Sequence, residues 1–579
     1  MEKNPQDLYA RFLDVQRTYA GRNATFDSLA TFFDGQHWDE TVEAGQEDMR
    51  LVLNYGRRAV LWHVAYTTKY SPRVDVPLRK TPDLGAVRRE RFLRAALASP
   101  SFRDTYRRIE LSAAKYGVGV LETLFLKSTE KRITQLPFVF RAINPRQFYP
   151  VYKTFDSPDN FLYVFLFDED RLVEDIEREY GVSLEATGGT PGTLLGTADL
   201  LEYWDEEDYI LLALTKRIVL NRMGKEEGEE IAPIVLRHEK NPLGRIPFFV
   251  LPNIVVEPFA DPTSGGGVSE ISLVQEVNRQ INLLVSLAQE EIAGRIHPPL
   301  VYKTDDPRQD PSAIRLGAGR TIPIGADEAL DVLRWEGIPA TVAEQRNALM
   351  QALRDLSGLP YTAFGAAGDT SGVGMRLSYA TLELSEALKF PEREGFLRRI
   401  FSFLLQTLDQ QLTAGQSVAL GAGKGTTPIA TDVLRKADID GNYECDVQAQ
   451  SAVPRDRIEW EQHVIYLYKT GVISQRTALE MLEGIPDPDL ELERIRQENQ
   501  DKELHPEKAA LIGKGEESPE QAQGRFNAAP PVPTLPSTPT QRNAPFLERG
   551  EVPNIRQLGG MQPGRGPGVN PGPPLEEAG

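Results

Sequence analysis

Residues 268–295 form a long run with apolar side chains at two separate sets of helical positions. A helix over Val268–Arg295 would be about 40 Å long at roughly 1.5 Å per residue. One helix with two apolar sides needs partners on both sides. A ring of copies packed side by side would bury both. The first row is Ile271, Val274, Ile281, Val285 and Ile292, and the second is Leu273, Val277, Leu284 and Leu287.

The elements that follow this helix have a distinctive order. The Pro298-Pro299 pair ends the helix, and short strands interrupted by turn residues then predict a small β module. Residues 342–356 are again amphipathic, residues 359–374 form a glycine-rich loop, and Met375–Leu412 is predicted to be a long helix. Pro391 should kink that helix in the turn before it. The module strands are predicted at Leu300–Tyr302, Arg320–Ile324 and Asp331–Leu333.

The N-terminal half mixes helices with strands. Leu8 to about Pro77 is mostly helical in pattern, and a second helix is predicted over Phe92–Gly117. Alternating short apolar segments and turns then predict an antiparallel β-rich region, so the fold class is mixed α+β. The predicted strands are Val120–Leu126, Phe138–Ile143, Phe161–Phe167, Leu200–Tyr203, Tyr209–Leu214, Ile231–Leu236 and Ile246–Leu251.

The C-terminal part divides into a helical region and a tail. Residues 455–504 predict three helices, with Gly471 and Gly484 as stops and Ser474 and Asp487 as N-caps. Proline, glycine and polar residues dominate from about residue 511 to 579. Such a composition buries too little apolar surface to offset chain entropy, so we expect a disordered tail.

Composition excludes several classes of protein. The formal net charge is −19, from 65 Lys+Arg against 84 Asp+Glu, which argues against tight binding of nucleic acid in a basic groove. The single cysteine, Cys445, cannot form an intrachain disulfide, so we expect a reducing compartment. The sequence has neither an apolar run long enough for a membrane span nor a signal-peptide core at its N-terminus.

Candidate catalytic and metal motifs fail on their spacing. Residues 421–426, Gly-Ala-Gly-Lys-Gly-Thr, invite a phosphate-loop interpretation, but Val418 occupies the first glycine position and Gly425 follows the lysine. Asp305, Asp306 and Asp310 miss the spacing of a calcium loop and read as a solvated turn. The helices after residue 455 are too acidic to be recognition helices. We therefore expect no enzyme activity, no cofactor and no metal site.

Several spaced motifs resemble those of one family of viral proteins. They are the helix at Leu51–Pro77, the helix-to-strand step Ala113–Leu121, the Asn144-Pro145 turn with Val151 and Tyr152, the element Asn241–Pro247, and the ending Gly471–Ser474 followed by Thr477–Leu479, Asp487-Pro488, Glu491, Glu493, Arg494 and Glu498. In this order, and together with the helix, β module, helix, loop and helix of residues 265–412, they resemble the portal (head-to-tail connector) proteins of tailed bacteriophages. The resemblance extends over roughly Leu51–Glu503.

The resemblance implies an architecture for the whole chain. It assigns a wing (1–264), a stem helix (265–297), a β-containing clip (298–339), a second stem helix (340–358), a channel loop (359–374), a kinked wing helix (375–414), a crown (415–510) and the tail (511–579). It also implies a ring of twelve subunits at one capsid vertex, assembled in the host cytoplasm. The ring would be the channel for double-stranded DNA in packaging and ejection. Its implied partners are the terminase large subunit, head-completion or adaptor proteins, and the major capsid and scaffolding proteins, with no membrane.

The channel-loop residues implied by the resemblance are Tyr361, Thr362, Phe364, Gly365, Gly368, Asp369, Thr370, Ser371 and Gly372. Acidic pairs such as Glu290 with Glu291 and Glu383 with Glu386 read mostly as solvated helix faces. Glu276, Glu290 and Glu291 are candidates to face the pore, where like charge would let DNA slide without being trapped. Two alternatives stay open: another ring-forming virion protein, and a nucleotide-dependent DNA-processing enzyme, for which no phosphate-binding loop is found.

Overall fold

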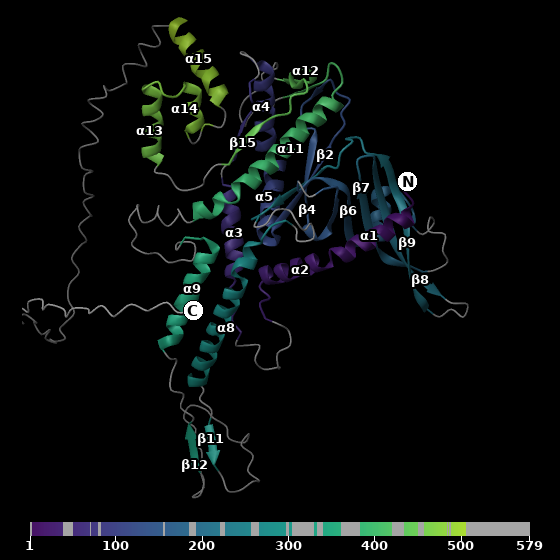
Figure 1. Ribbon diagram of the computed structural model, residues 1–579, viewed down its shortest axis with the longest axis vertical. Helices are drawn as coiled ribbons and strands as arrows, with labels where there is room; N and C mark the ends of the chain where they lie inside the picture. Colours follow the sequence, from purple (N-terminus) through teal and green to yellow (C-terminus); the bar gives the residue numbers. More distant parts are fainter. Residues whose placement is uncertain are drawn as a thin grey trace, which may run out of the picture. The chain divides into compact units, whose positions relative to one another are not determined.

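The structure is a computed structural model that divides the chain into two compact units, residues 1–488 and 489–579. It describes residues 3–38, 50–69, 71–78, 83–154, 157–184, 193–220, 226–255, 266–296, 300–303, 329–332, 340–360, 382–419, 433–449, 457–482, 485 and 488–504. The first unit contains both helices and β-sheets, in agreement with the mixed α+β prediction (Figure 1).

The largest sheet is an antiparallel meander of five strands. The order is β5 (Phe148–Tyr152), β6 (Phe161–Leu172), β7 (Thr193–Trp204), β8 (Asp208–Leu220) and β9 (Glu226–Lys240). Helix α1 (Pro5–Thr18) begins at the N-cap Asn4 and buries Leu8 and Phe12 against aromatic residues of this sheet. The predicted strands in this region are confirmed, although each is longer than its apolar segment.

A three-stranded sheet, β10–β2–β4, lies at the centre of the main core. Its strands are β10 (Phe248–Pro252), β2 (Val118–Phe125) and β4 (Phe138–Ile143), all antiparallel. The single helix predicted over Phe92–Gly117 is wrong, since α4 (Leu84–Ala98) and α5 (Pro100–Tyr116) are separate. Ser99 is extended and accepts a hydrogen bond from Phe102 N, while Pro100 occupies the first turn of α5.

The long helix is α8 (Glu270–Ile296), and α9 (Ala340–Ser357) packs along it (Figure 1). The buried contact joins Val274, Ile281 and Leu353. The predicted long helix Met375–Leu412 is instead broken: residues 382–387 are helical, residues 388–389 form a turn, and α11 (Phe390–Gln411) begins anew. Pro391 lies in the first turn of α11, so it starts a helix rather than kinking one.

Helix α11 has a broad apolar face that is buried in the main core. Its apolar side contacts the central sheet, α4 and α5, as the apolar pattern of the sequence predicts. The buried residues on this face are Phe396, Leu397, Ile400, Phe401, Phe403, Leu404, Leu405 and Leu408.

Short sheets join distant parts of the first unit. Strand β1 (Arg73–Asp75) pairs with β15 (Asp446–Gln448), and β13 (Ser417–Ala419) pairs with both β14 (Val433–Arg435) and β3 (Arg132–Ile133). Strands β11 (Leu300–Lys303) and β12 (Ala329–Val332) form the hairpin predicted for the small β module. The third predicted strand of that module, Arg320–Ile324, lies outside the described residues.

The remaining helices complete both units. In the first unit they are α2 (Ala20–Asp34), α3 (Tyr55–Thr67), η2 (Pro145–Gln147), α6 (Val173–Tyr180), α12 (Lys436–Ile439), α13 (Arg457–Lys469) and α14 (Gln475–Met481). Ser474 caps α14 as predicted, and Gly471 adopts a positive φ of 76°. Helix α15 (Pro488–Leu504) is the described part of the second unit. The predicted tail, 511–579, and Asp487 lie outside the described residues.

Candidate functional site at the start of the long helix

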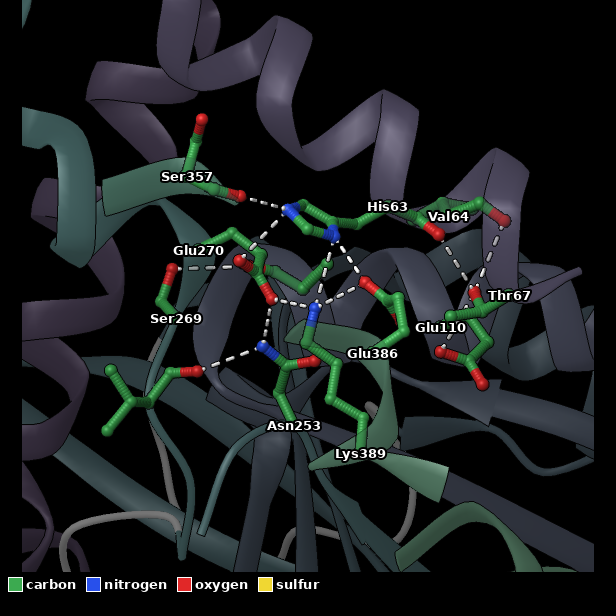
Figure 2. Close-up of polar contacts among 12 residues, drawn as sticks. His63, Val64, Thr67, Glu110, Asn253, Ser269, Glu270, Ser357, Glu386 and Lys389 are labelled. Atoms are coloured by element: carbon green, nitrogen blue, oxygen red, sulfur yellow. Dashed lines mark hydrogen bonds and ion pairs between the residues drawn. The ribbon is translucent and has the colours of Figure 1, made fainter. Parts of the chain in front are cut away.

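A buried network of charged side chains surrounds the first turn of α8. Lys389 Nζ lies 2.6 Å from Glu270 Oε1 and 2.8 Å from Glu386 Oε1, and both carboxylates lie close to the ring of His63 (Figure 2). All four side chains are at most 3% exposed. They come from α3, from the start of α8 and from residues 386–389, so the network joins three segments that are far apart in the sequence.

His63 is held from both ring nitrogens. Its Nδ1 contacts Glu386 Oε1, while its Nε2 lies 3.0 Å from the carbonyl oxygen of Ser357 and 3.4 Å from Glu270 Oε2. Lys389 Nζ also lies 3.1 Å from Nδ1. Ser357 is the last residue of α9, so the ring connects α3 with the ends of two other helices (Figure 2).

A second buried pair extends the network toward α5. The guanidinium of Arg393 donates from Nε and Nη2 to the carboxylate of Glu110, with a shortest distance of 2.7 Å. Tyr106 Oη donates to the same carboxylate at 2.6 Å. Two donors from one guanidinium fix the geometry of the pair as well as its charge. Asn253 bridges the two pairs, because its Nδ2 donates to Glu270 Oε1 at 2.8 Å and its Oδ1 faces Arg393 Nη2 at 3.5 Å.

The local electrostatics keep these acids ionised. Burial acts to raise the pKa of Glu270, but the charges of His63 and Lys389, with hydrogen bonds from Lys389 and Asn253, hold it below its usual value. Burial opposes ionisation of Glu386 too, and Lys389 and His63 again depress its pKa. For Arg393 burial acts to lower the pKa, but Glu110 raises it above its usual value. Each charge is thus stabilised by a specific opposite charge, and removal of one partner would leave another buried and unpaired.

A row of polar side chains on α8 fastens residues 51–56 along the helix. Asn278, Asn282 and Ser286 recur every four residues and are buried. Gly56 N donates to Asn278 Oδ1 at 3.0 Å, Leu53 N to Asn282 Oδ1 at 2.9 Å, and Leu51 N to Ser286 Oγ at 3.0 Å. Asn278 Nδ2 returns a bond to Leu53 O at 2.7 Å. These side chains supply the partners that buried backbone groups require.

Two glycines allow the closest approach at the start of α8. Gly117 ends α5 with φ +88°, and a Cβ there would lie 2.3 Å from the carbonyl oxygen of Gly267. Ser269, next to the first residue of α8, donates from Oγ to Lys115 O at 2.6 Å. The helix-to-strand step at residues 113–121, predicted from the sequence, therefore contacts the residues at which α8 begins.

The predicted site residues differ in burial, and some of them lie outside the described residues. Glu276 and Glu290 lie exposed on α8, and Glu291 is half-buried there. Glu386, interpreted as part of a solvated helix face, is instead fully buried, so that prediction is wrong. The channel-loop residues Tyr361, Thr362, Phe364, Gly365, Gly368, Asp369, Thr370, Ser371 and Gly372 lie outside the described residues, as do 421–426 and Asp305, Asp306 and Asp310.

One feature of the sequence indicates the buried polar row on α8. Polar side chains at 278, 282 and 286 follow one helical face between apolar neighbours, which is a pattern typical of a buried polar row. In the described part of the chain, no cluster of three or more His, Cys, Asp or Glu side chains could hold a metal ion. Among the described helices, none combines the length and apolarity needed to cross a bilayer.

These features define a mixed α+β protein in which one long helix is anchored by buried polar groups. Residues 338–503 match the model of a protein family described as "Phage portal protein, SPP1 Gp6-like". This match confirms the resemblance to phage portal proteins, a structural family whose members are components of the virion, and it supports a portal role.

Other comparisons add less. No curated protein matches the chain. One solved structure, described as "Neck of native GTA particle computed with C12 symmetry", is similar at 12% sequence identity and a TM-score of 0.34. That similarity covers 74% of this chain and 89% of the other. At this TM-score no argument about the present chain rests on the likeness.

Proposed function

We propose that this chain is the subunit of a portal ring, of twelve copies as the family resemblance implies, through which double-stranded DNA passes during packaging and ejection. The family match over residues 338–503 supports the portal role. The observation that carries the ring is a row of exposed leucines on α8, on the side away from its buried contacts.

The geometry of α8 leaves one of its two apolar sides uncovered. Ile271, Val274 and Ile281 are at most 1% exposed. In contrast, Leu273, Leu283 and Leu287 are 36%, 43% and 54% exposed. With 3.6 residues per turn, the three leucines fall within about 80° of one another and roughly opposite the buried side. A neighbouring copy is the occupant we propose for this exposed leucine row, and burial of its exposed surface would contribute about 1 kcal/mol per leucine.

The architecture implied by the family resemblance completes this proposal. Residues 265–297 and 340–358 would be the stem, 298–339 the clip, 359–374 the channel loop and 415–510 the crown. Residues 1–264 and 375–414 would form the wing. Terminase would dock at the clip, where head-completion proteins would later bind, and capsid and scaffolding proteins would contact the ring at the vertex. Motor ATPase activity would belong to the terminase.

Glu276, Glu290 and Glu291 are proposed to face or flank the channel. Glu276 and Glu290 share the side of α8 that carries the exposed leucine row, so a neighbouring copy there would place them beside the contact. Carboxylates near a polyanion reduce trapping of the DNA. Replacing all three by glutamine should leave ring assembly intact and slow the passage of DNA; unchanged packaging and retention would reject this role.

The ring is tested by placing charge in the exposed leucine row. In the double variant Leu283→Glu/Leu287→Glu, we expect native mass spectrometry and sedimentation to show subunits where the unaltered chain shows rings. Leu126→Glu is the matched control, because Leu126 is 53% exposed and lies just after β2. Assembly that survives in the double variant, with the control also assembled, would remove α8 from the contact.

A further inference from the structure

The buried network also holds together the two stretches of chain that border residues 361–381. On one side, the carbonyl oxygen of Ser357 lies 3.0 Å from His63 Nε2, within hydrogen-bonding distance. On the other side, Glu386 contacts the same imidazole, and Lys389 forms an ion pair with Glu270 (Figure 2). His63 on α3 and Glu270 at the start of α8 are thus the common anchor of both stretches.

Direct packing brings the two stretches into contact independently of the charges. Gly358 has φ +64°, and a Cβ added there would lie 2.9 Å from the side chain of Ser385. Leu359 and Leu382 are buried in one small cluster with Ala59 and Tyr66 of α3. The residues before and after 361–381 therefore lie against each other and against α3.

The charge balance of the network depends on His63. Glu110, Glu270 and Glu386 supply three carboxylates, and Lys389 and Arg393 supply two permanent cations. Both nitrogens of His63 face acceptor oxygens, namely Glu386 Oε1 on one side and Ser357 O with Glu270 Oε2 on the other. An imidazolium donates from both nitrogens, and it brings the buried charge to zero. Lys389 Nζ at 3.1 Å from Nδ1 is a like-charge contact, which the two carboxylates between these cations offset.

We propose that the network is a latch that fixes both borders of residues 361–381 to α3 and to the first turn of α8, and that it closes with His63 as the doubly protonated imidazolium. Displacement of either border relative to α8 requires buried ion pairs to separate, so the two borders move together with the start of α8. The proposal rests on the proposed function only in giving residues 359–374 the role of channel loop. The latch itself is a property of the subunit.

The test is a cycle of variants in the full chain: His63→Gln, Glu386→Gln and the two combined. The readout is hydrogen exchange of peptides covering 357–360, 382–389 and 266–272, with β6 as the distant control. His63→Gln leaves three carboxylates facing two cations, so exchange in all three peptides should rise by about tenfold or more together. The combined variant is neutral again, and its rates should return to within about threefold of the unaltered chain.

Two results would overturn the latch. One is a rise confined to a single border, or an equal rise in β6, because either shows that the borders are not held jointly. The other is faster exchange in the combined variant than in His63→Gln. If His63→Gln does not fold, Glu386→Gln and the combined variant carry the test. Glu386→Gln leaves three cations facing two carboxylates, so it should exchange faster than the neutral combined variant. Slower exchange in Glu386→Gln than in the unaltered chain would show that His63 is not charged. None of these readouts requires ring assembly, so failure of the latch and failure of the portal proposal are distinguishable.

Discussion

Gly117 shows how a single missing side chain determines where the long helix starts. Its carbonyl oxygen accepts a hydrogen bond from Asn253 N at 2.8 Å, and its own N–H donates to Ala113 O at 2.8 Å. Its φ is positive, and a Cβ added there would lie 2.3 Å from the carbonyl oxygen of Gly267, so the position has no room for a side chain. The backbone of three segments meets at this residue.

Gly117→Ala should therefore destabilise the subunit by about 3 kcal/mol, since both backbone strain and a steric clash are introduced. Gly181→Ala is the matched control: Gly181 also has positive φ (+67°), but it has open space around it. Strain alone should cost about 1 kcal/mol there. Chemical denaturation measures both values, and equal losses in the two variants would contradict the role given to the Gly117–Gly267 contact.

Glu122 makes the stability of the central sheet depend on pH. Burial raises the pKa of this carboxyl to about 7, Glu202 adds to the rise, and Arg141 opposes it. Arg141 Nε lies 3.0 Å from Glu122 Oε2, yet neither carboxylate oxygen accepts a well-aligned hydrogen bond from the residues that the structure describes. The charge of Glu122 is thus poorly compensated in the folded chain.

Because the folded-state pKa lies above the ordinary value of 4.5, this group favours folding most below pH 4.5. Its contribution falls as the pH rises and is lost once the pH passes about 7. Glu122→Gln should match the unaltered chain near pH 4.5 and exceed it by about 2 kcal/mol near pH 8. Denaturation curves across this range provide the check. A difference that does not change with pH would show that Glu122 is ionised at little cost.

At the scale of elements, α8 is anchored along its length by the polar row as well as at its start by the charge network. Asn282 is central to the row because it accepts from Leu53 N at 2.9 Å and contacts His37 Nδ1 at 2.6 Å. Asn282→Ala would leave a buried backbone N–H without its acceptor.

We expect Asn282→Ala to lower the free energy of unfolding by about 1–3 kcal/mol and to speed hydrogen exchange at residues 51–56. Gln280→Ala is the control on the same helix, since Gln280 is exposed and donates to Glu276 Oε1 at 2.9 Å on the surface. That change should stay within about 0.5 kcal/mol. Equal effects of the two changes would mean that the polar row does not hold residues 51–56.

The sequence predicts elements better than it predicts their boundaries. Phe138–Ile143 is found as predicted, because a strand with apolar alternation and turns on both sides is specified locally. The breaks at Ser99 and at residues 388–389 were missed, although Pro100 and Pro391 lie just after them. In both places proline occupies the first turn of a new helix, a position where its missing N–H costs nothing.

The candidate site was hidden for a different reason. Glu110, Glu270 and Glu386 have the side chains of surface residues, and their burial depends on partners up to 323 positions away. Local patterns carry no information on such pairings. In contrast, Leu273 and Leu287 of the exposed leucine row were part of the second apolar row predicted for this helix, whereas Leu283 was in neither predicted row and its exposure required the structure.

At the scale of the whole molecule, two properties agree with the ring proposed above. The chain carries a formal net charge of −19, which suits a channel that DNA must leave as readily as it enters. The exposed leucine row of α8 is apolar surface that a second copy of the chain would bury. In the proposed ring, both properties would act between subunits rather than within one.

The most direct measurement is electron microscopy of the purified full-length protein in negative stain. We expect rings with a central hole wide enough for duplex DNA, and a narrow stem in side views. Compact monomers or dimers at every concentration tested would contradict the ring.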